Sequence, residues 1–241
     1  MRIVFSLKTK VIPISYRMII VSLVKECLQQ ANEKYYRKLY ETNQAVLKPF
    51  TFAPYLKNFR FAEDEIYLDE LVLTFSSPDF EFMLHFYNGL RKVSWFRYKQ
   101  YEFIRGRVRM LPEQTIRNRS IIVKTQSPLL IEDENRKPVS PERPEFAKHF
   151  AYMADTILRE YRGKGLRESL IVTPLAMQKK VIKESNHVFT ETHGPNRYLY
   201  FTTYQGQLRL EGHPEDLQLL YQLGMGKRRG QGFGLVDVIR G

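Results

Sequence analysis

The stretch GMGKRRGQGFGLVDV, residues 224–238, contains five glycines and three basic residues before it becomes apolar. It follows HPEDLQLLYQLG, residues 213–224, which suits a short helix beginning near Gly212 or His213. It leads into GFGLVDVIR, residues 232–240, which is typical of a closing strand. A P-loop needs Ser or Thr after Gly-Lys, where this chain has Arg228, and a dinucleotide-binding loop opens a helix. The stretch is therefore a helix-to-strand loop that fits neither nucleotide-cofactor motif.

The composition of this loop suits a phosphate backbone as its ligand. Glycine reaches positive φ and lets a second backbone come close, while exposed N–H groups and cations hold phosphates. The alternative is a mobile C-terminal hairpin whose charges are merely solvated. The residues that we predict to bind the phosphate backbone are Gly224, Gly226, Lys227, Arg228, Arg229, Gly230 and Gly232.

The charge of the whole chain points to a polyanionic partner. The 241 residues carry a net charge of +12, which favours nucleic acid first and an anionic membrane second. No apolar run is long enough to span a membrane, and Lys8, Lys10 and Arg17 interrupt the apolar N-terminal segment. Cys27 is the only cysteine, which excludes internal disulfides and fits a reducing compartment. We therefore expect a cytoplasmic protein with a nucleic-acid partner and no membrane association.

The first half of the chain alternates between strand and helix patterns. The order β, α, β, β, α, β is the ferredoxin-like, or RNA-recognition-type, arrangement. The expected elements are a strand at 2–9, a helix at 15–41 capped by Ser15 with a break near Asn32, a strand at 48–55, two strands within 59–75 about a turn near Glu63 and Asp64, a helix from 78 that stops at Gly89, and a strand or hairpin at 93–111.

The second half repeats this order less regularly. Its expected elements are strands at 120–131, 169–177, 179–189 and 198–212, a helix at 144–162 that begins with Pro and ends at Gly163, and the short helix and closing strand around the glycine-rich loop. We predict an α+β protein with two tandem ferredoxin-like domains, residues 1–115 and residues 116–241, with the first carrying the active site and the second the glycine-rich loop.

A second basic region lies at residues 97–124, which hold eight basic and two acidic residues. On one strand Arg105, Arg107 and Arg109 would share a face and form a track for phosphates. We predict that these three arginines bind RNA together with Arg117 and Arg119, and Lys179, Lys180 and Lys183 form a further basic group. Tyr98, Tyr101 and Phe103 alternate with the arginines, so they could stack on bases or equally form the core side of the strand.

The loop sequence resembles the signature of the CRISPR-associated repeat-RNA endonucleases of the RAMP superfamily. MRIVFSL at residues 1–7, KPFTFAPY at 48–55 and TQSPLLI at 125–131 also resemble segments of that family, so the likeness spans nearly the whole chain. The resemblance implies tandem ferredoxin-like folds that bind CRISPR repeat RNA and cleave it without metal or cofactor. In such cleavage the 2′-hydroxyl attacks the adjacent phosphate and leaves a 2′,3′-cyclic phosphate. It also implies other CRISPR effector subunits, or a second copy, as possible partners.

Members of the family often use His, Tyr and Lys from the first domain. Tyr40 stands at the histidine position of this pattern, Lys48 matches the lysine, and Lys25 falls near the tyrosine position. Tyrosine has an ordinary pKa near 10 and is a poor general base at neutral pH, although it can donate a hydrogen bond or a proton. The candidate catalytic residues are therefore Tyr40, Lys48 and Lys25, with orientation for in-line attack as a further contribution. The alternative is that Tyr40 packs the domain as part of a tyrosine cluster.

Five histidines are present, and their spacing indicates no metal site. The expected roles are packing for His85 and His149, RNA contact for His187 and His193, and a helix start for His213.

Three functions are compatible with the sequence. The first is a metal-independent endoribonuclease that matures CRISPR RNA. The second is a protein that binds the repeat without cutting it, which the absence of the family's histidine favours. The third is a RAMP-type structural subunit that coats guide RNA in an effector complex. The glycine-rich loop is shared by all three classes and does not separate them.

Overall fold

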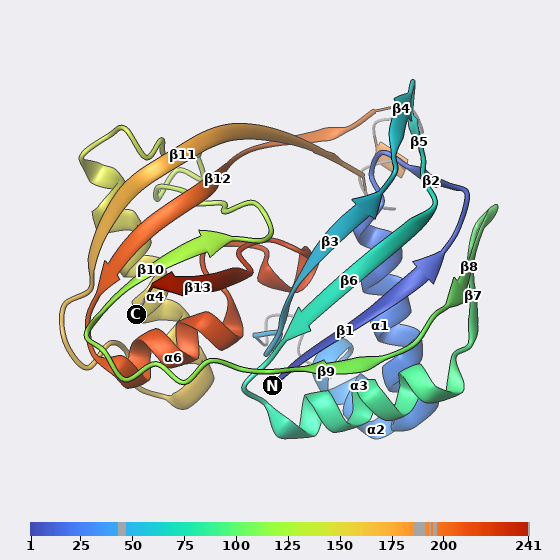
Figure 1. Cartoon of the computed structure of the whole chain (residues 1–241), viewed down its shortest axis with the longest axis horizontal. Coiled ribbons are helices and arrows are strands. Elements are labelled where there is room, and N and C mark those ends of the chain that lie inside the picture. The colour runs from blue at the N-terminus through green and yellow to red at the C-terminus, as the bar shows by residue number, and fades with distance from the viewer. Residues whose placement is uncertain (43–46, 186–190, 193, 195–196, 241) are drawn as a thin grey trace.

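The computed structural model describes residues 1–42, 47–185, 191–192, 194 and 197–240 of the chain. Two lobes lie side by side, each with an antiparallel sheet and helices packed on it (Figure 1). The first lobe contains the N-terminal half of the chain and the second lobe contains the C-terminal half.

The first lobe is built on a central strand, β1 (Arg2–Lys8), that pairs with β6 on one side and with β8 and β9 on the other. The main path of its sheet is β3-β6-β1-β8-β7, and three short strands form a second sheet in the order β2-β5-β4. The remaining elements are β2 (Val11–Pro13), α1 (Arg17–Ala31), α2 (Glu33–Tyr40), β3 (Thr51–Lys57), β4 (Arg60–Ala62), β5 (Glu65–Tyr67), β6 (Glu70–Ser76), α3 (Phe80–Lys92), β7 (Trp95–Tyr98), β8 (Tyr101–Arg105) and β9 (Arg109–Leu111).

The second lobe has the sheet order β11-β12-β10-β13. Its elements are β10 (Ser120–Thr125), α4 (Glu145–Arg162), β11 (Ile171–Glu184), β12 (Leu199–Glu211), α6 (Pro214–Leu223), the 3₁₀ helix η1 (Arg229–Gln231) and β13 (Val236–Arg240). In both lobes the first and third strands of the βαββαβ order lie next to each other in the middle of the sheet. The prediction of two tandem ferredoxin-like folds is confirmed.

Each lobe buries its own apolar cluster. The first cluster is rich in phenylalanine, with Phe5, Phe75 and Phe86 in ring contact, and its buried members lie between Ile3 and Phe103. The buried members of the second cluster begin at Ile116. The domain limit between residues 115 and 116 falls in the extended connection between β9 and β10 and stays a prediction.

Most of the predicted elements are present, with two differences in the helices of the first lobe. Asn32 separates α1 from α2, and its side chain accepts a hydrogen bond from the Tyr35 amide. The predicted Ser15 cap is wrong, because α1 begins at Arg17 after Tyr16. The predicted end of α3 at Gly89 is also wrong, because the helix continues to Lys92. A Cβ atom at Gly89 would lie 2.0 Å from the Cys27 carbonyl oxygen, so this glycine allows α3 to pack closely on α1.

The strands at 169–177 and 179–189 are not separate. They form one long strand, β11, whose register with β12 shifts between Pro174 and Ala176. Proline has no N–H to donate to a ladder, so a local irregularity lets the strand continue past it. Residues 186–189 of the predicted second strand lie outside the described residues.

The arginine track is not built as predicted. Arg105 ends β8, Arg107 lies in the connection and Arg109 begins β9, so they do not share one strand face. The break occurs at Gly106, where a Cβ atom would lie 2.3 Å from the Ser6 hydroxyl oxygen. Tyr101 and Phe103 are buried, so the base-stacking interpretation is wrong for them and the alternative of a core-facing side holds.

Two buried arginines connect the lobes. The guanidinium of Arg2 donates to the carbonyl oxygens of Tyr221 (3.2 Å) and Val236 (2.5 Å), and it pairs with Asp237. Arg17 pairs with Glu184 at the end of β11, with 3.1 Å between Nη1 and Oε1. A buried charge that loses its partner is costly, so both arginines favour the arrangement in which these contacts are made.

The close packing of α3 on α1 makes Gly89 a test of the fold. We expect Gly89→Ala to lower the free energy of unfolding by about 1–3 kcal/mol, because the added methyl group overlaps backbone that cannot move freely. Asn88→Ala is the matched control, since Asn88 is exposed on the same helix. Urea denaturation of both variants checks this, and equal midpoints for the two would contradict the packing role of Gly89.

Candidate functional site

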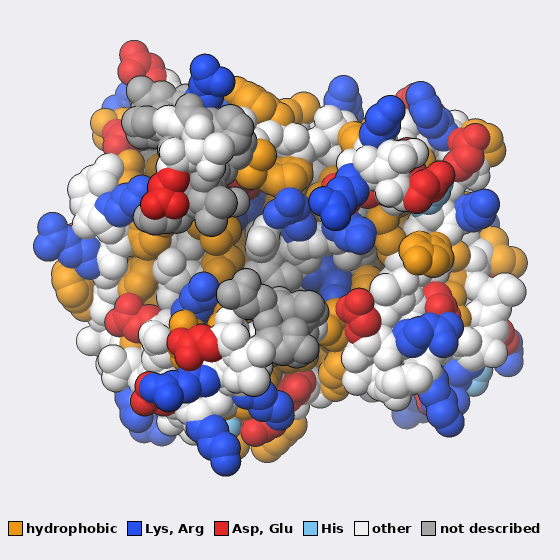
Figure 2. All heavy atoms as spheres, turned by 180° about the vertical axis from the view of Figure 1, so that it is seen from behind, with side chains coloured by type: hydrophobic (Ala, Val, Ile, Leu, Met, Phe, Trp, Pro, Cys, Tyr) orange, Lys and Arg blue, Asp and Glu red, His pale blue; other side chains and the backbone are white. Residues whose placement is uncertain are grey.

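A cavity of about 890 Å³ lies between the two lobes. Tyr40 and Lys48 line it from the first lobe, while α4 and the glycine-rich loop line it from the second. Seen from behind, the molecule has a depression between the lobes with Lys and Arg side chains around it (Figure 2). A cationic recess of this size can admit a phosphate-bearing ligand.

The glycine-rich loop forms one wall of this cavity and packs against β3 of the other lobe. Thr51 donates its hydroxyl hydrogen to the Phe233 carbonyl oxygen at 2.8 Å. A Cβ atom at Gly232 would lie 2.5 Å from the Phe52 ring, and one at Gly224 would lie 2.8 Å from Thr51. Both glycines have positive φ, so the backbone conformation and the close contact together require glycine. The loop is therefore a packed seam between the lobes rather than a solvated hairpin.

The three basic residues of the loop have different surroundings. Lys227 and Arg228 are exposed at the cavity, and Arg228 lies over the Phe201 ring at 4.3 Å. Arg229 is buried and donates to the Leu223 carbonyl oxygen at 3.0 Å. Burial lowers the pKa of Arg229 to about 10. Lys227 and Arg228 are therefore the loop cations that can reach a phosphate, while Arg229 holds the loop to the end of α6.

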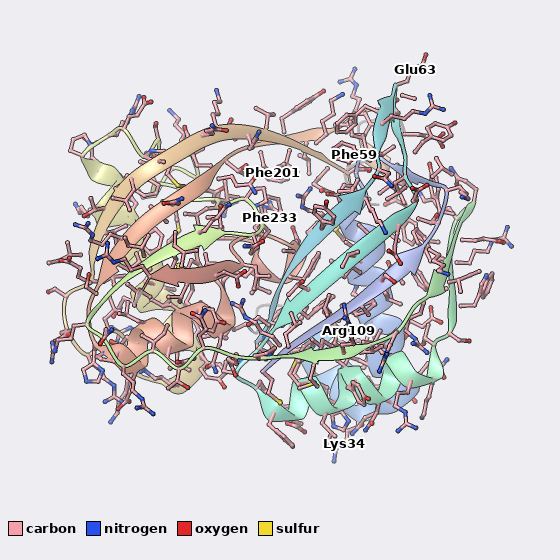
Figure 3. The ribbon with its side chains drawn as sticks, in the orientation of Figure 1. Lys34, Phe59, Glu63, Arg109, Phe201 and Phe233 are labelled. Carbon is pink, nitrogen blue, oxygen red and sulfur yellow. The ribbon has the colours of Figure 1, made fainter. Side chains whose placement is uncertain are left out.

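Two aromatic rings support the loop from the side of its own lobe. Phe201 of β12 and Phe233 of the loop lie close together (Figure 3), with ring centroids 6.1 Å apart in an edge-to-face arrangement. Arg17 of the first lobe lies 5.0 Å from the Phe233 ring centroid. Cations therefore stack on this aromatic pair from both lobes.

The three predicted catalytic residues lie close together around the Tyr40 ring. The Lys25 Nζ atom lies 5.1 Å from the Tyr40 ring centroid and the Lys48 Nζ atom lies 5.0 Å from it. Lys48 lies three residues before β3, and a Cβ atom placed on Gly230 of the loop would lie 3.0 Å from the Lys48 Cβ atom. The seam between loop and β3 therefore also positions the lysine.

The environment of Tyr40 favours a neutral phenol. Burial, with a smaller contribution from Tyr36, raises its pKa above the ordinary value. Its hydroxyl oxygen is buried and has no hydrogen-bond partner among the described residues, and its ring stacks on Tyr36 at 5.7 Å. Tyr40 is therefore unsuited to accept a proton at neutral pH.

The pKa of Lys48 is lowered, whereas that of Tyr40 is raised. The Lys48 Nζ atom donates to the Leu39 carbonyl oxygen at 2.6 Å. Burial lowers the pKa of Lys48, and the neighbouring charge of Lys25 lowers it further. A lysine whose pKa is lowered spends more time as a neutral amine, which is the form that accepts a proton.

The other predicted RNA-binding arginines lie elsewhere. Arg105 donates to the carbonyl oxygens of Val93 and Gly106, and Arg119 pairs with Glu168 at 2.7 Å. Arg107, Arg109 and Arg117 are exposed, and Arg109 lies over the first sheet at a distance from Phe233 and the loop (Figure 3). Among the described residues that line the cavity, none comes from this group of five arginines.

The wall formed by α4 was not predicted from the sequence. His149, Tyr152, Thr156 and Glu160 line the cavity from it, together with Lys148, Met153 and Ile157. Their spacing of three and four residues places them along one side of the helix. The amphipathic pattern predicted the helix, but the pattern alone does not say which part of the polar side faces the other lobe.

His85 and His213 have the roles expected from the sequence, which are packing and a helix start. His85 is half-buried, with its ring 4.9 Å from the Tyr35 ring and its Nε2 atom 3.2 Å from the Asn32 amide nitrogen. His213 caps α6 by accepting a hydrogen bond from the Glu215 amide at 3.3 Å. His187 and His193 lie outside the described residues.

The described residues contain neither a metal-ligand cluster nor a membrane-spanning helix. No group of three or more His, Cys, Asp or Glu side chains among them is placed to hold a metal ion. No helix in the described part of the chain has the length and apolar character needed to cross a membrane.

Two ferredoxin-like folds joined by a basic glycine-rich seam define a RAMP-type protein. The family model described as "CRISPR associated protein Cas6, C-terminal" matches residues 111–238, which is more than half of the chain. This chain belongs to the Cas6 family. No curated protein matches it by sequence.

Solved structures show the same fold over nearly the whole chain. The product of a Cas6-related gene from Pyrococcus furiosus has a TM-score of 0.81 at 19% identity and covers 99% of this chain and 98% of its own. A RAMP protein binding different RNA substrates has a TM-score of 0.79 at 18% identity and covers 100% of both chains. A Cas6 product complex has a TM-score of 0.70 at 14% identity and covers 99% of both chains. At these identities the likeness concerns the fold.

The seam can be tested at Gly232 with a matched glycine as the control. Gly232 and Gly163 both have positive φ, 83° and 76°, but only Gly232 has a side chain in the space of a Cβ atom. We expect Gly163→Ala to cost about 1–2 kcal/mol from backbone strain alone. Gly232→Ala should cost about 1–3 kcal/mol more, because the methyl group also overlaps the Phe52 ring. Chemical denaturation measures both, and equal losses would contradict the close contact between loop and β3.

Proposed function

We propose that this protein is a metal-independent endoribonuclease that binds the repeats of CRISPR precursor transcripts and cleaves them to give mature CRISPR RNA. The observation that carries the proposal is that Tyr40 and Lys48 line one inter-lobe cavity together with the exposed cations Lys227 and Arg228. Lys25 lies next to them, 5.1 Å from the Tyr40 ring centroid. Family membership and the neighbours' descriptions as an RNA-binding RAMP protein and a Cas6 product complex support the choice of substrate.

The proposed reaction is an attack of the 2′-oxygen on the adjacent phosphorus. Lys48, as the neutral amine, accepts the 2′-hydroxyl proton, the new P–O2′ bond forms and the P–O5′ bond breaks. Lys25, Lys227 and Arg228 stabilise the charge that develops on the phosphate oxygens. The products are a 2′,3′-cyclic phosphate and a 5′-hydroxyl end.

Tyr40 in this scheme supports the two lysines rather than exchanging a proton. Its ring lies about equally far from both ammonium groups, and cations are attracted to the face of an aromatic ring. The ring therefore holds two like charges in one small volume, and the charge of Lys25 adds to the effect of burial in lowering the pKa of Lys48.

RNA binding beyond the cavity involves the exposed arginines Arg107, Arg109 and Arg117 as a separate electrostatic surface. Arg105 and Arg119 are engaged with protein groups, so we assign them a smaller contribution. The reaction takes place in the cytoplasm, where CRISPR transcripts are made. Other CRISPR effector subunits and a second copy of the chain stay predictions as partners.

A second candidate function is repeat binding without cleavage. The observation that favours it is the buried hydroxyl of Tyr40, the residue that we align with the family's histidine, which has no hydrogen-bond partner among the described residues. The glycine-rich loop and the cavity serve both functions equally.

A cleavage assay separates the two candidates. The purified protein is incubated in EDTA with labelled repeat RNA from the CRISPR array of its own genome. A matched RNA carries a 2′-deoxy nucleotide at the scissile position. We expect cleavage of the first RNA only, with a 2′,3′-cyclic phosphate on the 5′ fragment. Tight binding of both RNAs without cleavage would overturn the endoribonuclease and leave the binding protein.

Substitutions should distinguish the lysine from the tyrosine. We expect Lys48→Ala to reduce the cleavage rate by about 10²–10⁴-fold, the usual contribution of a general base. Tyr40→Phe keeps the ring, so its rate should stay within about threefold of the unmodified protein, because the lost hydroxyl makes no hydrogen bond among the described residues. Single-turnover kinetics provide the rates. A large loss in Tyr40→Phe would show that the phenol takes part in proton transfer.

The pH dependence follows from the lowered pKa of Lys48. The neutral amine becomes more abundant as pH rises. With a substrate whose leaving group needs no protonation, such as RNA with a bridging 5′-sulfur at the scissile phosphate, the cleavage rate should therefore rise with pH and level off below the pH expected for an ordinary lysine. Lys48→Arg keeps the positive charge but does not deprotonate, so it should lose this activity. An active Lys48→Arg variant with an unchanged pH profile would show that Lys48 acts only as a cation.

A further inference from the structure

The proposed reaction leaves one proton unassigned. The 5′-oxygen departs as an alkoxide unless a group in the site protonates it, and a positioned acid typically contributes about 10²–10⁴-fold to such a step. Tyr40 is poorly placed to act as this acid, because its hydroxyl is buried and has no hydrogen-bond partner among the described residues. Among the described residues that line the cavity, the first lobe therefore supplies Lys48 as the base and no separate group to act as the acid.

The opposite wall of the cavity carries an imidazole. His149 lines the same cavity as Tyr40 and Lys48, and it is the only histidine among the described lining residues. It is half-buried on α4, one helical turn before the buried Met153. Met153 and Ile157 anchor this side of the helix in the second lobe. The imidazole is therefore held at the inter-lobe surface by a rigid element.

We propose that His149 is the general acid of this site, so that the two lobes each supply one proton-transfer residue. The inference rests on the proposed endoribonuclease function. As the P–O5′ bond breaks, the imidazolium of His149 gives its proton to the 5′-oxygen and becomes a neutral imidazole. Lys48 has gained the 2′-hydroxyl proton in the same turnover, so the net charge of the two residues is unchanged. Exchange of protons with water then restores both residues.

The neighbours of His149 suit a nucleotide at this place. Tyr152, three residues further along α4, is 72% exposed and lines the cavity. An exposed tyrosine of this kind can stack on an unpaired base, which would set the sugar-phosphate next to the imidazole.

The charges around His149 come from every element of the cavity. Six basic and four acidic residues line the cavity. The cations are Lys48, Arg136, Lys148, Lys227, Arg228 and Arg229, and the acids are Glu132, Asp133, Glu134 and Glu160. Because Asp133 already accepts hydrogen bonds from the amides of Asn135 and Lys137, its carboxylate has a structural role in the turn.

A substrate with a sulfur leaving group tests the role of His149 directly. The repeat RNA is compared with the same RNA in which sulfur replaces the bridging 5′-oxygen at the scissile phosphate. A thiolate leaves without being protonated, so loss of the general acid should affect only the oxygen substrate. The variants are His149→Ala and the closer replacement His149→Gln, with His213→Ser as a control that keeps a capping side chain outside the cavity.

We expect both His149 variants to cleave the oxygen substrate about 10²-fold or more slowly, with RNA affinity and thermal unfolding unchanged. Their rates on the sulfur substrate should match that of the unmodified protein, and His213→Ser should be unchanged on both substrates. A wild-type rate on the oxygen substrate, or an equal loss on both substrates, would overturn the role of His149 while the endoribonuclease stands. Failure of the unmodified protein to cleave either substrate in EDTA would overturn the proposed function itself, and the role of His149 with it.

Discussion

The contact between the glycine-rich loop and strand β3 is the constraint on which the site depends. Gly232 leaves no room for a side chain beside the Phe52 ring, and the hydroxyl of Thr51 binds the loop at Phe233. Lys48 lies three residues before this strand, so the contact that joins the lobes also sets the lysine beside the loop. The buried guanidinium groups of Arg2 and Arg17 connect the lobes at separate points. These contacts together bring groups more than 170 residues apart in sequence close to one another.

The electrostatics of the site follow from this geometry. Two lysines flank a single tyrosine ring at about 5 Å, and partial burial denies them full hydration. Burial, and to a smaller degree the neighbouring charge of Lys25, lowers the pKa of Lys48, while Lys227 and Arg228 are exposed at the cavity. In the proposed reaction the same recess offers a base and phosphate-binding cations, and the base does not have to stand at the Tyr40 position. The proposed acid comes from the facing wall, because residues of both lobes line the cavity.

The sequence predicted features whose causes are local. The start of α6 at His213, the break at Asn32, the Gly163 end of α4 and the tandem order of strands and helices depend on neighbouring residues and were predicted correctly. Gly89, Arg229 and His149 depend on elements far away in sequence. A glycine that ends a helix and one that admits a second helix look alike in one sequence. Similarly, an arginine run does not reveal which of its members is buried.

We propose that one cavity between the lobes holds the scissile phosphate. A crystal structure of the protein with repeat RNA made uncleavable by a 2′-deoxy nucleotide would show where this phosphate binds. We expect the scissile phosphate between Lys48 and His149, in contact with Lys227 or Arg228, and the adjacent base near Tyr152. A scissile phosphate bound outside this cavity, for example along Arg107, Arg109 and Arg117, would contradict it.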